Sequence, residues 1–172
     1  MPIRDVELYF PAREDGPRVL SNRGANGIDG TVSSAFGAAA AGEGRVVLLI
    51  GDVAVAHDIG GLVAARRLGL SLTIVLLNND GGGIFHFLPV AGQSDAFEEH
   101  VATPHGISFV GAASTYDCDY ARPSSLAELR AAVERSVAGS GTAIIEVRTD
   151  RVENLELHRR AAEAALSALP RP

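Results

Sequence analysis

The fold is decided by two stretches of sequence, VVLLIGD at residues 46–52 and TIVLLNNDGGG at residues 73–83. Each begins with a continuous run of aliphatic residues, which is typical of a parallel strand buried on both faces. A third run, AIIEV at residues 143–147, has the same character. Residues 58–70 have apolar side chains at helical spacing, so the pattern predicts a strand–helix–strand unit with a right-handed crossover.

Further helices are expected outward from this unit, at residues 29–41, 125–137 and 152–169. The first is rich in Ala and Gly, which suits close packing on a sheet, and Ser125 with Glu128 forms a start signal for the second. Val19-Leu20 suggests a short strand. These elements predict the α/β class: a three-layer, doubly wound, mostly parallel sheet within a single domain spanning residues 1–172.

The composition excludes several classes of function. The chain has 172 residues, 47% of them hydrophobic, and a formal net charge of −6 without a basic cluster, so no nucleic-acid partner is expected. Cys118 is the single cysteine and cannot form an internal disulfide. No stretch is long and apolar enough for a membrane span or a secretory signal, so we expect a cytoplasmic location.

Oxygen-bearing side chains follow two of the predicted strands. Gly51-Asp52 follows the first, and Asn78-Asn79-Asp80-Gly81 follows the second. Parallel strands joined by a crossover end on the same edge of the sheet, so these loops should converge there. Carboxylate, amide and carbonyl oxygens are donors that Mg²⁺ prefers, usually together with phosphate oxygens. The loops therefore predict a phosphorylated cofactor held through a metal ion, although such residues are also common in ordinary turns.

The spacing of these residues resembles a known cofactor motif. Gly51-Asp52, 26 intervening residues and then Asn79 are similar to the thiamine diphosphate motif, with Val53 in place of its usual second glycine. Three longer strings, SNRGANGIDG at residues 21–30, NNDGGGIF at residues 78–85 and TPHG at residues 103–106, resemble the MenD family. Its members are the menaquinone-pathway synthases of 2-succinyl-5-enolpyruvyl-6-hydroxy-3-cyclohexene-1-carboxylate.

The resemblance implies the diphosphate-binding domain fold, as a C-terminal fragment of a longer enzyme. It implies thiamine diphosphate and Mg²⁺ (or Mn²⁺) as cofactors, with Asp52 and Asn79 binding the metal through side chains and Gly81 through its carbonyl. The cofactor-binding residues it implies are Ile28, Gly51, Asp52, Val53 and Asn79, with Ile28 supporting the cofactor rings unless it is simply a core residue. Asp80 replaces a more usual Asn and is expected beside the metal without binding it.

The resemblance also implies 2-oxoglutarate and isochorismate as substrates of a transferase that decarboxylates the first and adds the resulting succinyl carbanion to the second. Arg4 and Arg23 match substrate-binding arginines, which suits carboxylates because guanidinium groups bind them bidentately. Ile84 and Phe85 match residues that line the active site. The resemblance further implies that the catalytic glutamate that activates the cofactor lies on a pyrimidine-binding domain of the same enzyme, in another subunit. This chain alone should therefore be inactive, and a homo-oligomer is expected.

Two alternatives remain from the residues alone. A nucleotide-binding Rossmann-like domain would use the same sheet edge, but its Gly-x-Gly-x-x-Gly fingerprint does not follow a first strand here. A non-catalytic remnant or partner module of the same fold is the second alternative. Four further candidates have no spacing typical of a zinc site or a nucleophilic triad and receive no role: His57, His86, His105 and Cys118.

Overall fold

The computed structural model describes residues 1–22 and 27–169, which build an α/β arrangement around one parallel sheet. Its four strands are β1 (Val47–Gly51), β2 (Leu72–Asn78), β3 (Asp119–Ala121) and β4 (Thr142–Arg148), in the order β1-β2-β4-β3. All three strand pairs are parallel. The strands predicted at residues 46–50, 73–77 and 143–147 are confirmed. The sequence did not predict β3, because three residues carry no apolar run.

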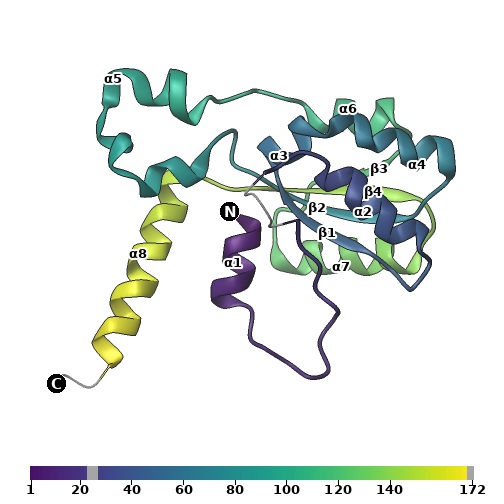
Figure 1. Ribbon diagram of the computed structural model, residues 1–172, viewed down its shortest axis with the longest axis horizontal. Coiled ribbons are helices and arrows are strands. Elements are labelled where there is room, and N and C mark those ends of the chain that lie inside the picture. The colour runs from purple at the N-terminus through teal and green to yellow at the C-terminus, as the bar shows by residue number, and fades with distance from the viewer. Residues whose placement is uncertain (23–26, 170–172) are drawn as a thin grey trace.

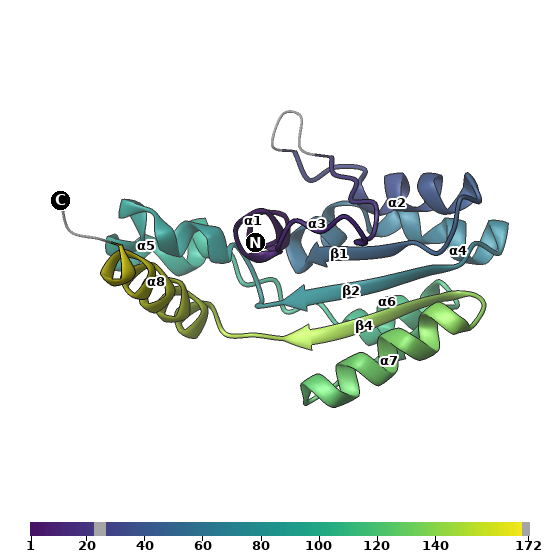
Figure 2. The same ribbon diagram turned by 90° about the horizontal axis from the view of Figure 1, so that it is seen from below.

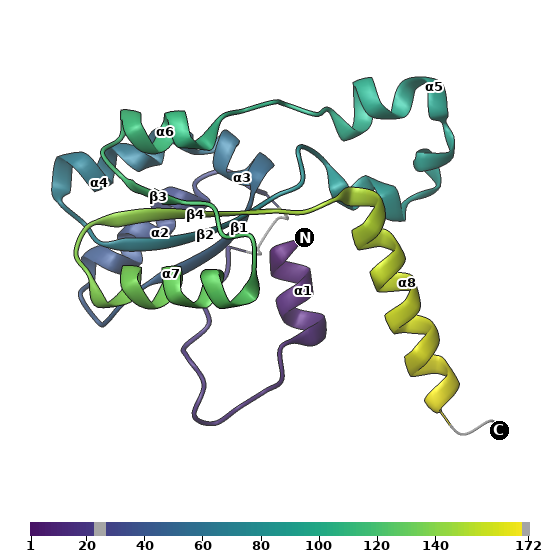
Figure 3. The same ribbon diagram turned by 180° about the vertical axis from the view of Figure 1, so that it is seen from behind.

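Helices cover both faces of the sheet, which confirms the three-layer prediction (Figure 1). On one face, β-strand residues such as Ile74, Leu76 and Ile144 share a core with Val32 and Phe36 of α2 (Thr31–Ala40). The helices α4 (Val63–Leu68) and α6 (Phe109–Thr115) complete that layer. The opposite face is covered by α7 (Leu126–Ala138), as Figures 2 and 3 show. Successive strand residues point to opposite faces, so each layer receives every second side chain.

Strand β1 differs from the expectation of burial on both faces. Val47 and Leu49 are 49% and 41% exposed, whereas Ile50 is 3% exposed. The physical reason is that α7 contacts β2 and β4, so it leaves the β1 part of its face uncovered along most of its length among the described residues. At the carboxyl end of β1, α1 (Pro2–Tyr9) contacts the strand. The hydrophobic run therefore predicted the strand correctly and its burial incorrectly.

The predicted helices form with shifted bounds. Residues 58–70 split into a 3-10 helix, η1 (Ile59–Leu62), and α4. Helix α2 lies so close to η1 that a side chain on Gly61 would be 2.7 Å from Ser33 Oγ. The start signal of α7 is confirmed, since Ser125 Oγ accepts a hydrogen bond from the Glu128 N–H. The terminal helix is α8 (Arg151–Ala168), which Asp150 caps. The prediction of a strand at Val19-Leu20 is wrong, and α1 was not predicted.

The segment between β2 and β3 extends beyond the carboxyl ends of the strands (Figure 1). The part beyond the strands contains the 3-10 helices η2 (Gly83–Phe87) and η3 (Pro89–Gly92), α5 (Ser94–Phe97) and a π-helix at Glu98–Ala102. Helix α6 then packs on the sheet. Arg151 Nη2 at the start of α8 donates to Glu98 Oε2 at 2.9 Å and ties this segment to the terminal helix. Within residues 1–22 and 27–169, no helix has the length and apolarity needed to cross a membrane.

Candidate functional site

The loops after β1 and β2 converge as the sequence predicted. Gly51 ends β1, and Asp52 begins the short helix α3 (Asp52–His57). The Asp52 side chain is buried, and its Oδ2 accepts a hydrogen bond from the Gly81 N–H at 3.0 Å. Its Oδ1 accepts one from the Val53 N–H at 2.8 Å. The Val53 N–H at the start of α3 is therefore hydrogen bonded to the aspartate itself.

Asn79 presents an oxygen that lacks a partner. Its Oδ1 is buried and makes no hydrogen bond. The amide nitrogen of Asn79 lies close to the backbone of Gly83. A side chain on Gly83 would be only 2.4 Å from Asn79 Nδ2. Buried polar atoms are nearly always paired, so an unpaired oxygen here indicates a position for a ligand.

A third segment, distant in sequence, completes the group that we call the edge site (Asp52, Asn79, Gly81 and His105). His105 Nε2 lies 3.1 Å from Asp52 Oδ2. Its loop is fixed by Asp80, whose Oδ1 accepts hydrogen bonds from the N–H groups of His105 and Gly106 at 3.2 and 2.9 Å. The Gly106 N–H is the main cause that holds the pKa of Asp80 below its ordinary value.

Gly81 allows the loop after β2 to lie close to the segment that carries His105. Its φ is 131°, and a side chain at this position would lie 2.3 Å from the Ala102 carbonyl oxygen. That same oxygen accepts a hydrogen bond from the Gly82 N–H at 2.7 Å. The segment that carries His105 is therefore joined to the loop that carries Asn79.

The donors of the edge site suit Mg²⁺. The Asp52 carboxylate, the unpaired Asn79 oxygen and the Gly81 carbonyl offer the hard oxygen donors that this ion prefers. The Gly81 carbonyl oxygen accepts a hydrogen bond from the Gly83 N–H at 2.9 Å, and its second lone pair stays available for a metal ion. Within the described residues, no group of three or more His, Cys, Asp or Glu side chains could hold a metal, so a site built only from those side chains is not available there.

Asn78, the neighbour of Asn79, belongs to a different group, which we call the inner network (Asn78, Tyr120, Glu146 and Arg148). Asn78 is fully buried, and its Nδ2 donates to Glu146 Oε1 at 2.8 Å while its Oδ1 accepts the Asp80 N–H at 3.0 Å. Tyr120 donates to Glu146 Oε2 at 2.5 Å, and Arg148 Nη1 lies 3.4 Å from Glu146 Oε1. Burial and the bond to Glu146 raise the pKa of Tyr120 to about 12.

The structure connects the predicted substrate and cofactor residues to this edge to different extents. Arg4 is half-buried on α1, and Pro2 of that helix would be 3.7 Å from a side chain on Gly51. Ile84 and Phe85 lie on η2, directly after the glycines, and Phe85 is partly exposed. Ile28 is also partly exposed and its carbonyl accepts the Thr31 hydroxyl. Arg23 lies outside the described residues.

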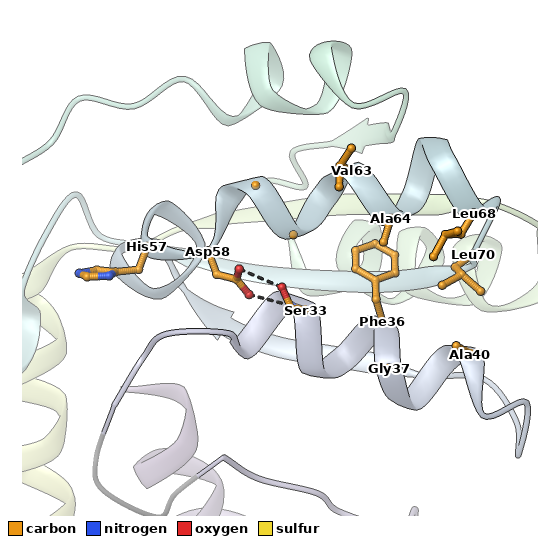
Figure 4. A pocket seen from close by; sticks show the side chains of 12 residues that line it. Ser33, Phe36, Gly37, Ala40, His57, Asp58, Val63, Ala64, Leu68 and Leu70 are labelled. Carbon is orange, nitrogen blue, oxygen red and sulfur yellow. Dashed lines mark hydrogen bonds between the residues drawn. The ribbon is translucent and has the colours of Figure 1, made fainter.

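A separate groove of about 560 Å³ lies between α2 and the η1–α4 segment (Figure 4). Its walls include Phe36 and Leu68, and Asp58 crosses one end by accepting hydrogen bonds from Ser33 N–H and Oγ. None of the predicted metal ligands lines it. The groove is therefore not the site that the sequence predicted.

Of the four side chains left without a role, only His105 reaches a predicted metal ligand among the described residues. His57 pairs with Asp29, His86 packs its ring edge-on against Phe97, and burial raises the pKa of the Cys118 thiol to about 11. The sequence missed His105 because 52 residues separate it from Asp52, which no motif spacing covers. The one available signal was its place in the string TPHG.

Curated relatives are similar to almost the whole chain. The 2-succinyl-5-enolpyruvyl-6-hydroxy-3-cyclohexene-1-carboxylate synthase of Bacillus velezensis is 45% identical over 96% of this chain, and that of Geobacillus kaustophilus is 50% identical over 92%. The aligned parts are 29% and 27% of those proteins. The chain thus spans less than a third of the length of these relatives. These identities confirm the expected resemblance of the chain to the MenD family.

Solved structures agree with the fold. A thiamine diphosphate-dependent 4-hydroxybenzoylformate decarboxylase of Rhodococcus jostii superposes with a TM-score of 0.60 at 26% identity, over 68% of this chain and 22% of that one. Benzoylformate decarboxylase of Polynucleobacter necessarius gives 0.59 at 21% identity, over 70% and 23%, which supports the fold alone. The family model described as "Thiamine pyrophosphate enzyme, C-terminal TPP binding domain" matches residues 5–147. The chain belongs to this family of C-terminal, thiamine pyrophosphate-binding domains.

Proposed function

We propose that this chain binds thiamine diphosphate through a Mg²⁺ ion held by Asp52, Asn79 and Gly81. The observation that carries the proposal is the buried Asn79 oxygen without a partner, in the loop that bonds Asp52. A divalent cation would satisfy that oxygen and the Asp52 charge together, and Mn²⁺ would serve as well. Gly51 and Val53 would lie against the diphosphate as part of the same strand end.

We further propose that the chain is the diphosphate-binding part of a synthase that decarboxylates 2-oxoglutarate and adds the succinyl group to isochorismate. The names and the 45–50% identity of the relatives support this assignment. When bound, thiamine diphosphate supplies the chemistry that removes carbon dioxide from a 2-oxo acid. Arg4 and Arg23 would bind substrate carboxylates, Ile84 and Phe85 would line the substrate space, and Ile28 would support the cofactor.

The complete reaction needs more than this chain in our proposal. The chain covers less than a third of its relatives, and a pyrimidine-binding domain of the same enzyme would supply the glutamate that activates the cofactor. We therefore expect no turnover of 2-oxoglutarate by the isolated chain and some turnover when that domain is added in trans. A homo-oligomeric assembly and a cytoplasmic location stay predictions of the sequence.

Calorimetric titration tests cofactor binding. The parent chain should bind thiamine diphosphate only with Mg²⁺ or Mn²⁺ present, and it should not bind ATP or NAD. Asp52→Ala should remove this binding, whereas Asp15→Ala, at an exposed aspartate paired with Arg13, should leave it unchanged. Equal affinity of Asp52→Ala and the parent would overturn the assignment. Metal-dependent binding without turnover in the presence of the pyrimidine-binding domain would favour the non-catalytic module instead.

A further inference from the structure

The two carboxylate oxygens of Asp52 have unequal surroundings. Oδ2 has two neighbours that can donate, the Gly81 N–H at 3.0 Å and His105 Nε2 at 3.1 Å. Oδ1 accepts a single hydrogen bond, from the adjacent Val53 N–H. Each carboxylate oxygen can accept about two hydrogen bonds. Oδ2 is therefore filled, and Oδ1 keeps the capacity for one more partner.

The backbone determines which nitrogen of His105 carries the proton. The Ile107 N–H donates to His105 Nδ1 at 3.0 Å, which makes Nδ1 the unprotonated acceptor, and the nearby Asp80 Oδ1 lies 3.4 Å from Nδ1. The proton of the neutral ring then resides on Nε2, which points to Asp52 Oδ2 as a donor. The ring is largely buried and packs edge-on against Phe109, with ring centroids 5.9 Å apart. The imidazole is thus fixed on three sides.

The loop that carries His105 is itself fastened to the metal-binding loop. Asp80 Oδ1 accepts the N–H groups of His105 and Gly106, and the Ala102 carbonyl accepts the Gly82 N–H. These bonds place His105 beside Asp52 although the sequence separates them widely. Hydrogen bonds that orient metal-binding side chains contribute to metal affinity because they fix the ligand before the ion arrives.

We propose that His105 is a positioning residue of the metal site: its Nε2–H holds Asp52 Oδ2, so that Oδ1 stays free for the metal ion. The inference rests on the proposed function, since it assumes that Asp52 is a metal ligand. His105 itself touches neither the ion nor the cofactor in this role. Asp80 acts one step further out, by holding the loop from which His105 reaches Asp52.

The affinity of the full chain for Mn²⁺ in the presence of thiamine diphosphate tests this role, with free Mn²⁺ followed by electron paramagnetic resonance. His105→Phe keeps an aromatic ring but loses the donor, and it should weaken Mn²⁺ binding by about tenfold. His105→Gln keeps an amide N–H near the position of Nε2 and should recover most of the affinity. The matched control is His100→Phe, at a histidine whose side chain is 68% exposed on the preceding π-helix. It should bind like the parent.

Three outcomes are informative. If the parent binds no Mn²⁺ with thiamine diphosphate, the proposed function fails, and this inference fails with it. If the parent binds and His105→Phe binds equally well, only the role of His105 is overturned. If His105→Phe does not fold, His105→Gln and the nitrogen-15 spectrum of the metal-free parent decide. That spectrum should show His105 protonated on Nε2, and protonation on Nδ1 would contradict the proposal.

Discussion

Asn78 and Asn79 are consecutive in the sequence, yet they serve opposite purposes in the structure. Asn78 belongs to the inner network, where both ends of its amide are hydrogen bonded. Asn79 belongs to the edge site, where its buried oxygen has no partner. The difference arises because successive side chains at a strand end point in opposite directions. One asparagine is directed toward Glu146 and the other toward the loops beyond the sheet.

The comparison teaches which of the two groups stabilises the fold and which is available to a ligand. A paired buried network contributes to stability, and removing one member leaves the others unpaired at a cost in free energy. A buried oxygen without a partner carries a cost in free energy that a bound ligand can remove. We therefore expect mutations in the inner network to lower stability and mutations in the edge site to lower binding.

Glu146→Ala should have the largest effect. The change removes the acceptor of Asn78 and Tyr120 at once and leaves both donors unpaired inside the protein. We expect the free energy of unfolding to fall by about 3 kcal/mol, measured by urea denaturation. Glu134→Ala, at an exposed glutamate of α7, is the control and should change it by less than about 0.5 kcal/mol. Similar losses in the two variants would contradict the structural role of the network.

Tyr120→Phe should come next. It keeps the ring and removes only the hydroxyl that donates to Glu146 Oε2. A hydrogen bond to a charged group contributes more than a neutral one, so the loss should be about 1.5 kcal/mol in the same denaturation experiment. Tyr116→Phe is a matched control, because its hydroxyl makes none of the hydrogen bonds found among the described residues. A loss confined to Tyr120→Phe would sharpen the contrast between the two groups.

Asn79→Ala should reverse the pattern. Its oxygen has no partner to lose, so the free energy of unfolding without metal should stay within about 0.5 kcal/mol of the parent. Metal-dependent binding of thiamine diphosphate should weaken by about tenfold, or about 1.4 kcal/mol, by calorimetry. A large loss of stability with unchanged binding would place Asn79 with Asn78 and remove the distinction between them.

The last prediction concerns the loss of stability at high pH. The pKa of Tyr120 is about 12 in the folded chain against 10.0 for an ordinary tyrosine. Because the folded state holds this proton more tightly, the associated stability is complete below pH 10.0 and is lost as the pH rises to about 12. Over that range the parent should lose stability more steeply than Tyr120→Phe. The raised Cys118 pKa affects both proteins and cancels in the difference, and the sequence contains no lysine to titrate. If stability fell equally with pH in the parent and in Tyr120→Phe, the raised pKa of the Tyr120 hydroxyl would be contradicted.

Much of the sheet could be predicted from sequence because three strands are continuous aliphatic runs. Their carboxyl ends, with Asp52 and Asn79, followed from parallel topology alone. Strand β3 could not be predicted, since its residues Asp-Tyr-Ala are held by pairing with β4 rather than by their own pattern. The exposure of Val47 could not be predicted either, because it depends on which helix lies over β1 and not on the residues of the strand.

The site was predictable only in part, for a related reason. Loops that directly follow strands inherit their position from the sheet, so Asp52 and Asn79 could be placed together. His105 lies on a long irregular segment and owes its position to hydrogen bonds with Asp80 and Asp52, which the spacing of residues in the sequence does not predict. Glu146 lies inside a predicted strand, and the sequence pattern gives no sign that Asn78 and Tyr120 would both donate hydrogen bonds to it.

The hydrogen bonds of Asp80 and Gly81 also affect the rate at which this Asp-Gly peptide can isomerise. An Asp-Gly sequence is prone to isomerise, because the glycine nitrogen attacks the aspartate side chain to form a cyclic imide. Here the Gly81 N–H is donated to Asp52, and the Asp80 carboxylate is held by the backbone of His105 and Gly106. The attacking nitrogen and its target are thus each restrained by other partners. Folding therefore protects this peptide from a slow covalent damage that the unfolded chain would undergo freely.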